Sequence, residues 1–120
     1  MPRSTASTPS ARKPVSRTAA RPSRSTRPIM QLLELLGRRW AMRVLWELRD
    51  GRRSFRGLQE ACGGISPAVL NERLRELRDG RLVELVEGEG FGLSPLGREL
   101  YERFHPMVTW ADRWAKSLPK

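Results

Sequence analysis

The apolar and polar positions between residues 66 and 80 follow the pattern of a capped amphipathic helix. Leucines recur at helical spacing and would share one face: Leu70, Leu74 and Leu77. Ser66 suits the N-cap, and Pro67 suits the first helical position because its missing N–H costs nothing there. We expect Gly80 to end this helix as its left-handed residue.

Four side chains of this helix lie away from the leucine stripe and are free to touch another molecule: Ala68, Asn71, Glu72 and Arg75. Asparagine pairs with adenine, arginine with guanine, glutamate with the cytosine amino group, and alanine with the thymine methyl. A short capped helix with such a face, after another short helix, is how a helix-turn-helix protein contacts bases in the major groove. The alternative is a solvated face on which Glu72 pairs with Arg75, and Glu76 with Arg73 or Arg78.

Three further helices are expected before this one, at residues 29–36, 40–49 and 55–62. Pro28 opens the first of them and Gly37 closes it. Ser54 can cap the third, and the Gly63-Gly64 pair forms the turn that leads to the helix at residue 67.

A short ribbon and a helical region follow the capped helix. Residues 81–87 alternate as a strand, and residues 91–93 return as a short partner. The Ser94-Pro95 pair begins the last helical region, which Pro106 interrupts or kinks. The order predicts a mainly α (α+β) fold, with a helix-turn-helix, a two-stranded wing and terminal helices.

The apolar positions of these elements predict one small core. Its expected members are Leu32, Leu36, Val44, Leu45, Leu48, Phe55, Leu58, Ile65, Leu70, Leu74, Leu77, Leu82, Leu85 and Leu93. The first and last segments carry more apolar residues than such a core needs, and exposed apolar area marks interaction sites. We expect a dimer surface containing Trp110, Trp114, Met107 and Leu32, although these side chains could instead cover their own protomer's core.

The net charge of +10 is unevenly distributed along the chain. Residues 1–27 carry seven basic side chains and no acid, whereas the remainder carries 16 basic and 13 acidic side chains. A segment of that composition cannot bury enough apolar surface to offset its ordering entropy. We predict a disordered basic tail over residues 1–27 and one domain over residues 28–120. The tail could bind nucleic acid through counterion release, or it could serve solubility alone.

Little in the chain could carry catalysis or hold a metal. Cys62 and His105 are the only residues of their kinds, which excludes an intramolecular disulfide and a zinc site. We expect Cys62 to be a core residue rather than a redox sensor. No apolar run reaches the length of a membrane span, and there is no hydrophobic signal-peptide core. The prediction is a cytoplasmic protein that is no enzyme and binds no cofactor.

Basic residues near the start of the third helix are candidates for phosphate contact. We expect that role for Arg52, Arg53 and Arg56, together with Ser66, whose hydroxyl and helix N-terminus suit an anion. Arg38 and Arg39 are weaker candidates.

Several motifs occur in an order and spacing that resemble one known family. They are Gly37-Arg38-Arg39-Trp40, Leu45-Trp46-Glu47-Leu48, Arg53-Ser54-Phe55-Arg56-Gly57-Leu58, Gly64-Ile65-Ser66-Pro67 and Leu93-Ser94-Pro95-Leu96-Gly97. Over residues 27–116 the chain resembles the HxlR-type winged helix-turn-helix transcriptional regulators. The resemblance implies a dimeric bacterial transcription factor whose helix from Pro67 enters the major groove and whose terminal helices form the dimer.

Two positions depart from the family pattern. The family often has Cys-Pro at the start of the domain, where this chain has Arg27-Pro28, which excludes thiol-based sensing at that position. The wing turn is short and acidic, with Glu87 and Glu89, and phosphate would repel it from a minor groove. The arginine-rich arm before Pro28 is expected to take over the minor-groove or backbone role.

These observations favour a sequence-specific double-stranded DNA-binding regulator, a homodimeric repressor associated with the nucleoid. One alternative is a winged-helix protein-interaction module without base recognition, which the acidic wing and mildly basic domain keep open. Non-specific binding to DNA or RNA through the tail is another. A ligand pocket between core and terminal helices, lined by Trp40, Phe104 and Trp110, is an open possibility, and its effector is unknown.

Overall fold

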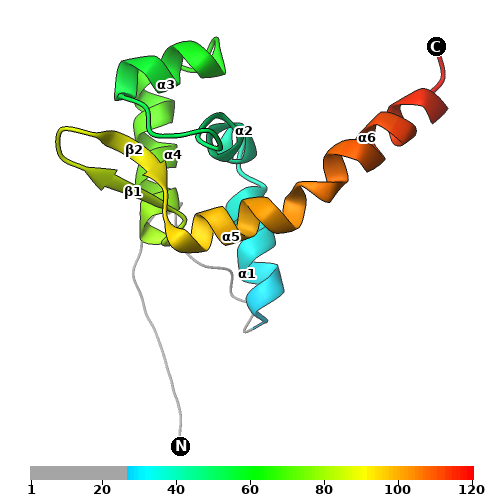
Figure 1. Ribbon diagram of the computed structural model, residues 1–120, viewed down its shortest axis with the longest axis horizontal. Helices are drawn as coiled ribbons and strands as arrows, with labels where there is room; N and C mark the ends of the chain where they lie inside the picture. Colours follow the sequence, from blue (N-terminus) through cyan, green and yellow to red (C-terminus); the bar gives the residue numbers. More distant parts are fainter. Residues whose placement is uncertain (1–26) are drawn as a thin grey trace, which may run out of the picture.

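The computed structural model describes residues 27–120, which form six helices and one antiparallel pair of strands (Figure 1). The predicted tail therefore lies outside the described residues, apart from Arg27. In chain order the elements are α1 (Pro28–Leu36), α2 (Ala41–Glu47), α3 (Phe55–Cys62), α4 (Pro67–Asp79), β1 (Val83–Val86), β2 (Gly90–Leu93), α5 (Pro95–Phe104) and α6 (Pro106–Ser117). This confirms the mainly helical fold with a two-stranded wing.

Three helices begin at a serine, as the sequence predicts for local capping. The Oγ atoms of Ser54, Ser66 and Ser94 each accept a hydrogen bond from a backbone N–H three residues later, at 3.0, 3.1 and 2.9 Å. Each cap contributes about 1 kcal/mol, because it pairs an N–H that the helix leaves unbonded. The second helix is shorter than residues 40–49, since Trp40 has a left-handed backbone (φ 78°) and ends the turn before it.

The core lies around α2, which packs against α1, α3, α4 and α5. Most of the predicted core residues are buried: Leu36, Val44, Leu45, Leu48, Leu58, Ile65, Leu70, Leu74, Leu77 and Leu82. Leu32, Phe55 and Leu93 are half-buried and pack against its edge. Figure 1 shows α3 lying across one end of α4, with the wing to the side of α4 and α1 near its other end.

The prediction that Gly80 is the left-handed residue is wrong by one position. Gly80 has φ −80°, and Arg81 takes the positive φ of 66°. Leu82 N–H donates to Leu77 O and Arg81 N–H to Arg78 O, both at 2.9 Å, so the helix ends in a Schellman motif. Gly80 lies close to α1, since a Cβ at this position would be 2.7 Å from Cδ2, the end of the flexible Leu35 side chain.

The prediction that Leu85 is buried is also wrong, since its exposed fraction is 45%. Val83 and Leu85 share one face of β1, but only Val83 lies close enough to the core to be covered by it. Leu85 is paired with Phe91 and lines an open hollow beside Phe55. The wing extends beyond the core at that point, and period-two alternation alone does not show where the core ends.

The wing is anchored to the loop before α3 by two backbone hydrogen bonds. Arg53 N–H donates to Phe91 O at 2.9 Å, and Phe91 N–H donates to Arg53 O at 2.8 Å. The close approach requires glycine at position 90, where φ is 95° and a Cβ would lie 2.4 Å from Arg53 O. The wing is therefore held against the helix-turn-helix rather than hanging from one end of it.

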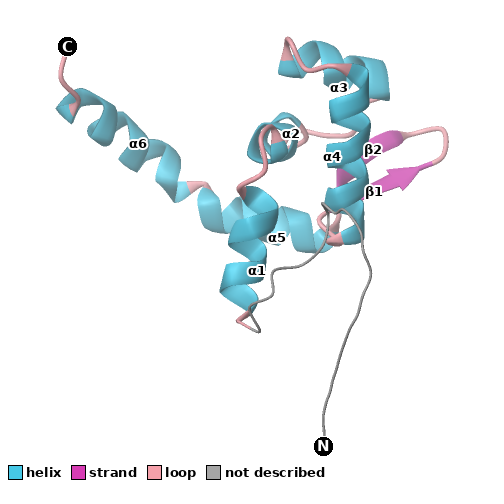
Figure 2. Cartoon of the chain, turned by 180° about the vertical axis from the view of Figure 1, so that it is seen from behind, coloured by secondary structure: helices cyan, strands magenta, loops and turns pink. Residues whose placement is uncertain are grey.

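The last helix extends away from the rest of the molecule, as Figure 2 shows from behind. The chain bends between Phe104 and Pro106, where the sequence predicts an interruption, and α6 packs against α5 only near the bend. None of the residues of α6 is buried. In the described part of the chain, no helix is long and apolar enough to cross a membrane.

Candidate nucleic-acid interface

The face of α4 opposite the leucines is exposed and polar. Ala68, Asn71 and Arg75 are exposed, and Glu72 is half-buried; we call these four residues the reading face. Arg75 makes no hydrogen bond or ion pair with any of residues 27–120, so its guanidinium is available to an acceptor outside the chain. The alternative interpretation paired Glu72 with Arg75. In the structure its cationic neighbour is Arg73, with Nη1 3.9 Å from Glu72 Oε1.

The turn before α4 needs its two glycines. Gly63 has φ 62° and Gly64 has φ 92°, and neither position has a neighbour that would crowd a side chain. Their requirement is therefore one of backbone conformation, which places α4 at an angle to α3. The result is the helix-turn-helix arrangement that the sequence predicts.

The candidate phosphate residues are in unlike environments. Arg56 is exposed on α3 and makes no hydrogen bond or ion pair within residues 27–120. Ser66 is exposed at the start of α4, and its hydroxyl accepts from Val69 N–H. Arg53 is half-buried and donates through Nε to Glu47 O at 2.8 Å. Arg56 and the start of α4 are thus the parts of this set most open to a phosphate.

Arg52 is engaged by the wing. Its Nη2 donates to Glu84 Oε2 at 2.8 Å, its Nη1 donates to Gly90 O at 3.3 Å, and its Nε lies 3.6 Å from Glu89 Oε1. This guanidinium therefore offsets two of the wing carboxylates. Glu87 lies exposed in the turn between the strands and has no such cationic partner within residues 27–120.

Glu76 pairs with Arg73, as the alternative interpretation of α4 proposed, but in a different setting. It is not on a solvated face, because its exposed fraction is 1%. Both of its carboxylate oxygens accept from Arg73 Nη1, at 3.1 and 3.2 Å, and Arg38 Nε lies 3.9 Å away. The spacing of Arg73 and Glu76 indicates the pair, but the burial comes from the turn between α1 and α2, which a local pattern does not reveal.

Cys62 is buried in the core, as predicted. Burial raises the pKa of its thiol above the ordinary 9.0, and the charges of Arg43 and Arg53 offset this in part. The thiol is therefore protonated near neutral pH, which is unsuited to a reactive sensor. Among residues 27–120, no group of His, Cys, Asp and Glu side chains could hold a metal ion.

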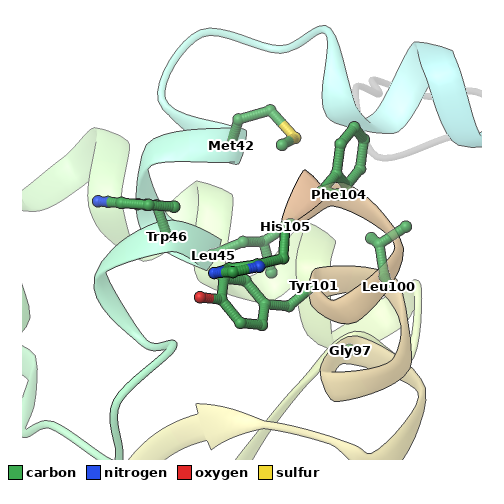
Figure 3. A pocket seen from close by; sticks show the side chains of 8 residues that line it. All are labelled: Met42, Leu45, Trp46, Gly97, Leu100, Tyr101, Phe104 and His105. Carbon is green, nitrogen blue, oxygen red and sulfur yellow. The ribbon is translucent and has the colours of Figure 1, made fainter. Parts of the chain in front are cut away.

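An apolar pocket lies between α2 and α5 and reaches the bend before α6 (Figure 3). Its lining residues are Met42, Leu45, Trp46, Gly97, Leu100, Tyr101, Phe104 and His105. The expectation for Phe104 is confirmed, but Trp40 and Trp110 are not part of this lining: Trp40 packs against the core, and Trp110 lies on the projecting helix. The Tyr101 ring meets His105 edge-on, with ring centroids 5.7 Å apart.

The candidate dimer residues divide between two settings. On α6, Met107, Trp110 and Trp114 are about half exposed, and the two indole rings stack with centroids 6.4 Å apart and planes 10° from parallel. Leu32 is half-buried against the core of its own protomer. The exposed apolar positions of α1 are its neighbours Ile29, Met30 and Leu33.

The order of elements agrees with comparisons to known proteins. The model of the HxlR-like helix-turn-helix family matches residues 35–118, from the end of α1 to the end of α6. The chain belongs to this family. This HxlR-like protein is 34% identical over 88 residues to the HTH-type transcriptional regulator YodB of Bacillus subtilis, which covers 68% of this chain and 79% of YodB.

Two further similarities extend over most of the domain. The HTH-type transcriptional regulator MJ0925 of Methanocaldococcus jannaschii is 28% identical over 96 residues, or 76% of this chain and 90% of MJ0925. The crystal structure of quinone-bound YodB from Bacillus subtilis matches with a TM-score of 0.65 and 34% identity, covering 73% of this chain and 99% of YodB. This HxlR-like protein is therefore a DNA-binding transcriptional regulator with a winged helix-turn-helix fold.

Proposed function

We propose that this HxlR-like protein is a homodimeric repressor that recognises a specific operator by placing α4 in the major groove. The observation that carries the proposal is the reading face itself. Asn71 and Arg75 are exposed one helical turn apart on a helix whose opposite face is buried. These are the side chains that pair bidentately with adenine and guanine. Ala68 and Glu72 flank them and would complete the contact with bases.

The phosphate contacts would come from the start of α4 and from α3. Ser66 and the first N–H groups of α4 form a helix N-terminus, which favours an anion. Arg56 is exposed, and its guanidinium can donate two parallel hydrogen bonds to one phosphate. Arg53 is a weaker contributor, and Arg52 would act mainly by offsetting the charge of the wing.

The acidic turn argues against insertion of the wing into a minor groove. Glu87 would approach the phosphates without a cationic partner within residues 27–120. We propose that the basic arm of residues 1–26 supplies the minor-groove or backbone contacts in its place. The arm lies outside the described residues, so its support is its composition alone.

The dimer would form through α6 and the exposed side of α1. A stacked pair of half-exposed tryptophans on a helix that packs little against its own protomer is typical of an interface. A two-fold dimer would present two copies of α4 about one helical turn of DNA apart. Such a dimer represses by occupying a promoter, which places the protein on the nucleoid in the cytoplasm.

The test is a selection of bound duplexes from a random library by the full chain at near-physiological salt. The double variant Asn71→Ala with Arg75→Ala, confirmed as folded by circular dichroism, serves as the control. We expect the wild-type protein to enrich a two-fold symmetric site and the variant to enrich none. Transcription in vitro from a promoter overlapping that site should then fall when the protein is added.

Two results would contradict the proposal. A folded wild-type dimer that enriches no sequence would point to a protein-interaction module or to non-specific binding. A site that the control variant enriches equally well would show that α4 does not contact bases.

A further inference from the structure

Glu76 is the only buried charged residue among residues 27–120, and it lies on the helix that carries the reading face. Arg73, one turn earlier, donates to both of its oxygens. Arg73 also donates through Nε to Arg39 O at 2.7 Å, and Arg38 Nε lies 3.9 Å from Glu76. We call Arg38, Arg73, Glu76 and the Arg39 carbonyl the α4 network.

The α4 network connects the recognition helix to a turn of unusual backbone. Arg38 and Arg39 lie between α1 and α2, in the turn that ends with Trp40 at φ 78°. A bulky residue adopts that conformation only where its surroundings hold it. The hydrogen bond from Arg73 to Arg39 O therefore attaches α4 to a fixed part of the backbone.

A second contact acts at the end of the same helix. Leu35 of α1 lies so close to Gly80 that a Cβ at position 80 would be 2.7 Å from Leu35 Cδ2. The end of α1 and the turn after it therefore meet α4 at two levels, one through polar groups and one through apolar packing.

The position of the network on the helix indicates what it controls. With 100° between successive residues, Arg73 and Glu76 lie on the flank between the leucine face and the reading face. Apolar packing of the leucines is non-directional, so it keeps the helix on the core but tolerates small rotations about the helix axis. Hydrogen bonds weaken when they are misaligned, so they oppose such a rotation. Apolar residues of similar volume in place of a buried ion pair often leave stability unchanged.

We propose that Glu76 and Arg73 are positioning residues that set the rotation of α4 about its own axis, so that discrimination between DNA sequences depends on an ion network that does not touch DNA. The inference rests on the proposed function, because it assumes that Asn71 and Arg75 contact bases. A rotation of the helix would move both side chains off the base edges while leaving phosphate contacts nearly as they are.

Three full-length variants test the proposal. Glu76→Gln keeps the shape and removes the charge. Arg73→Met combined with Glu76→Leu removes the hydrogen bonds and leaves no unpaired carboxylate, which guards against loss of folding. Asp79→Asn, on the same helix, exposed and outside both the reading face and the network, is the matched control for a lost charge. The stability of each variant is compared with wild type by thermal melting. Two affinities are then measured for each protein: one for the duplex that the wild-type selection enriches, and one for a scrambled duplex.

We expect the ratio of the two affinities to fall about tenfold or more in both network variants and to change less than about threefold in Asp79→Asn. Affinity for the scrambled duplex and its salt dependence should stay near the wild-type values. If the network had a purely structural role, both affinities would fall by the same factor, because both would depend on the fraction of protein that is folded. That result would overturn the proposal. So would a folded double variant with an unchanged ratio.

Failure of the proposed function gives a different result. In that case the wild-type selection enriches no site, and the present inference is overturned together with it. If the wild-type protein enriches a site but the variants keep the same ratio of operator to scrambled affinity, only the role of the network is rejected, and the proposed function stands.

Discussion

The Arg52 guanidinium donates to Glu84 on β1 across 2.8 Å, so a residue that the sequence marks as a candidate phosphate contact supports the wing. Glu89 adds a second carboxylate 3.6 Å from the same side chain. The pairing leaves Glu87 as the exposed acid of the turn without a described cationic partner, and it makes the wing the least basic part of the proposed interface.

Reversal of charge at Glu87 should therefore strengthen binding to any duplex. We expect Glu87→Lys to raise affinity for operator and scrambled DNA together, with a salt dependence steeper by about one unit of log–log slope if the lysine reaches a phosphate. Titration of labelled duplex at several salt concentrations measures this. Glu102→Lys, an exposed substitution on α5 with the same change in charge, is the control. An equal gain in both variants would refute a wing near DNA.

Gly90 should tolerate substitution less well than Gly88 in the same turn. Both have positive φ, at 95° and 81°, but only at Gly90 would a Cβ meet backbone, 2.4 Å from Arg53 O. We expect Gly88→Ala to cost about 1 kcal/mol of unfolding free energy and Gly90→Ala at least about 2 kcal/mol, because the clash adds to the conformational cost. Urea unfolding of both variants gives the comparison, and equal losses would contradict the wing anchor.

The Cys62 thiol should be unreactive in the folded protein. Burial raises its pKa above 9.0, so the neutral form is favoured on folding. Its contribution to stability is then full below the unfolded-state pKa and is lost as pH rises through the folded-state pKa. We expect no reaction with a thiol reagent at pH 7 until denaturant is added. Between pH 8 and 10, wild type should lose more stability than Cys62→Ala; the opposite order would contradict the assignment.

Removal of the two indole rings of α6 should dissociate the proposed dimer. Buried tryptophans at interfaces contribute about 2 kcal/mol or more each. We expect Trp110→Ala with Trp114→Ala to sediment as a monomer with an unchanged helical spectrum. Leu96→Ala, which removes an exposed apolar side chain from α5, should stay dimeric. A double variant that remains a dimer would move the interface elsewhere.

Deletion of residues 1–26 should lower DNA affinity and flatten its dependence on salt. The segment carries basic residues and no acid, and each phosphate contact contributes to the slope through counterion release. The deletion should leave the preference for operator over scrambled duplex largely in place, because that preference is assigned to α4. A truncated protein with the full salt slope would show that the arm makes no DNA contact.

Local features of the fold could be predicted because they depend on neighbours within a few residues. Serine caps, Pro67 at the first helical position, the leucine face of α4 and the break at Pro106 each follow from hydrogen bonds or sterics inside one turn. The exposed reading face followed in the same way, as the side of the helix opposite its leucines.

Contacts between distant segments decided the rest. Glu76 is buried because the turn after α1 lies over it. Leu85 is exposed because the wing extends beyond the core at that point. Gly80 packs against Leu35 of α1, and Arg52 pairs with Glu84 of the wing, 32 residues away in the chain. The sequence by itself determined the elements and their order, because periodicity and capping are local. Only the tertiary structure decided which charges are paired and which apolar residues are covered, because both depend on which segments meet.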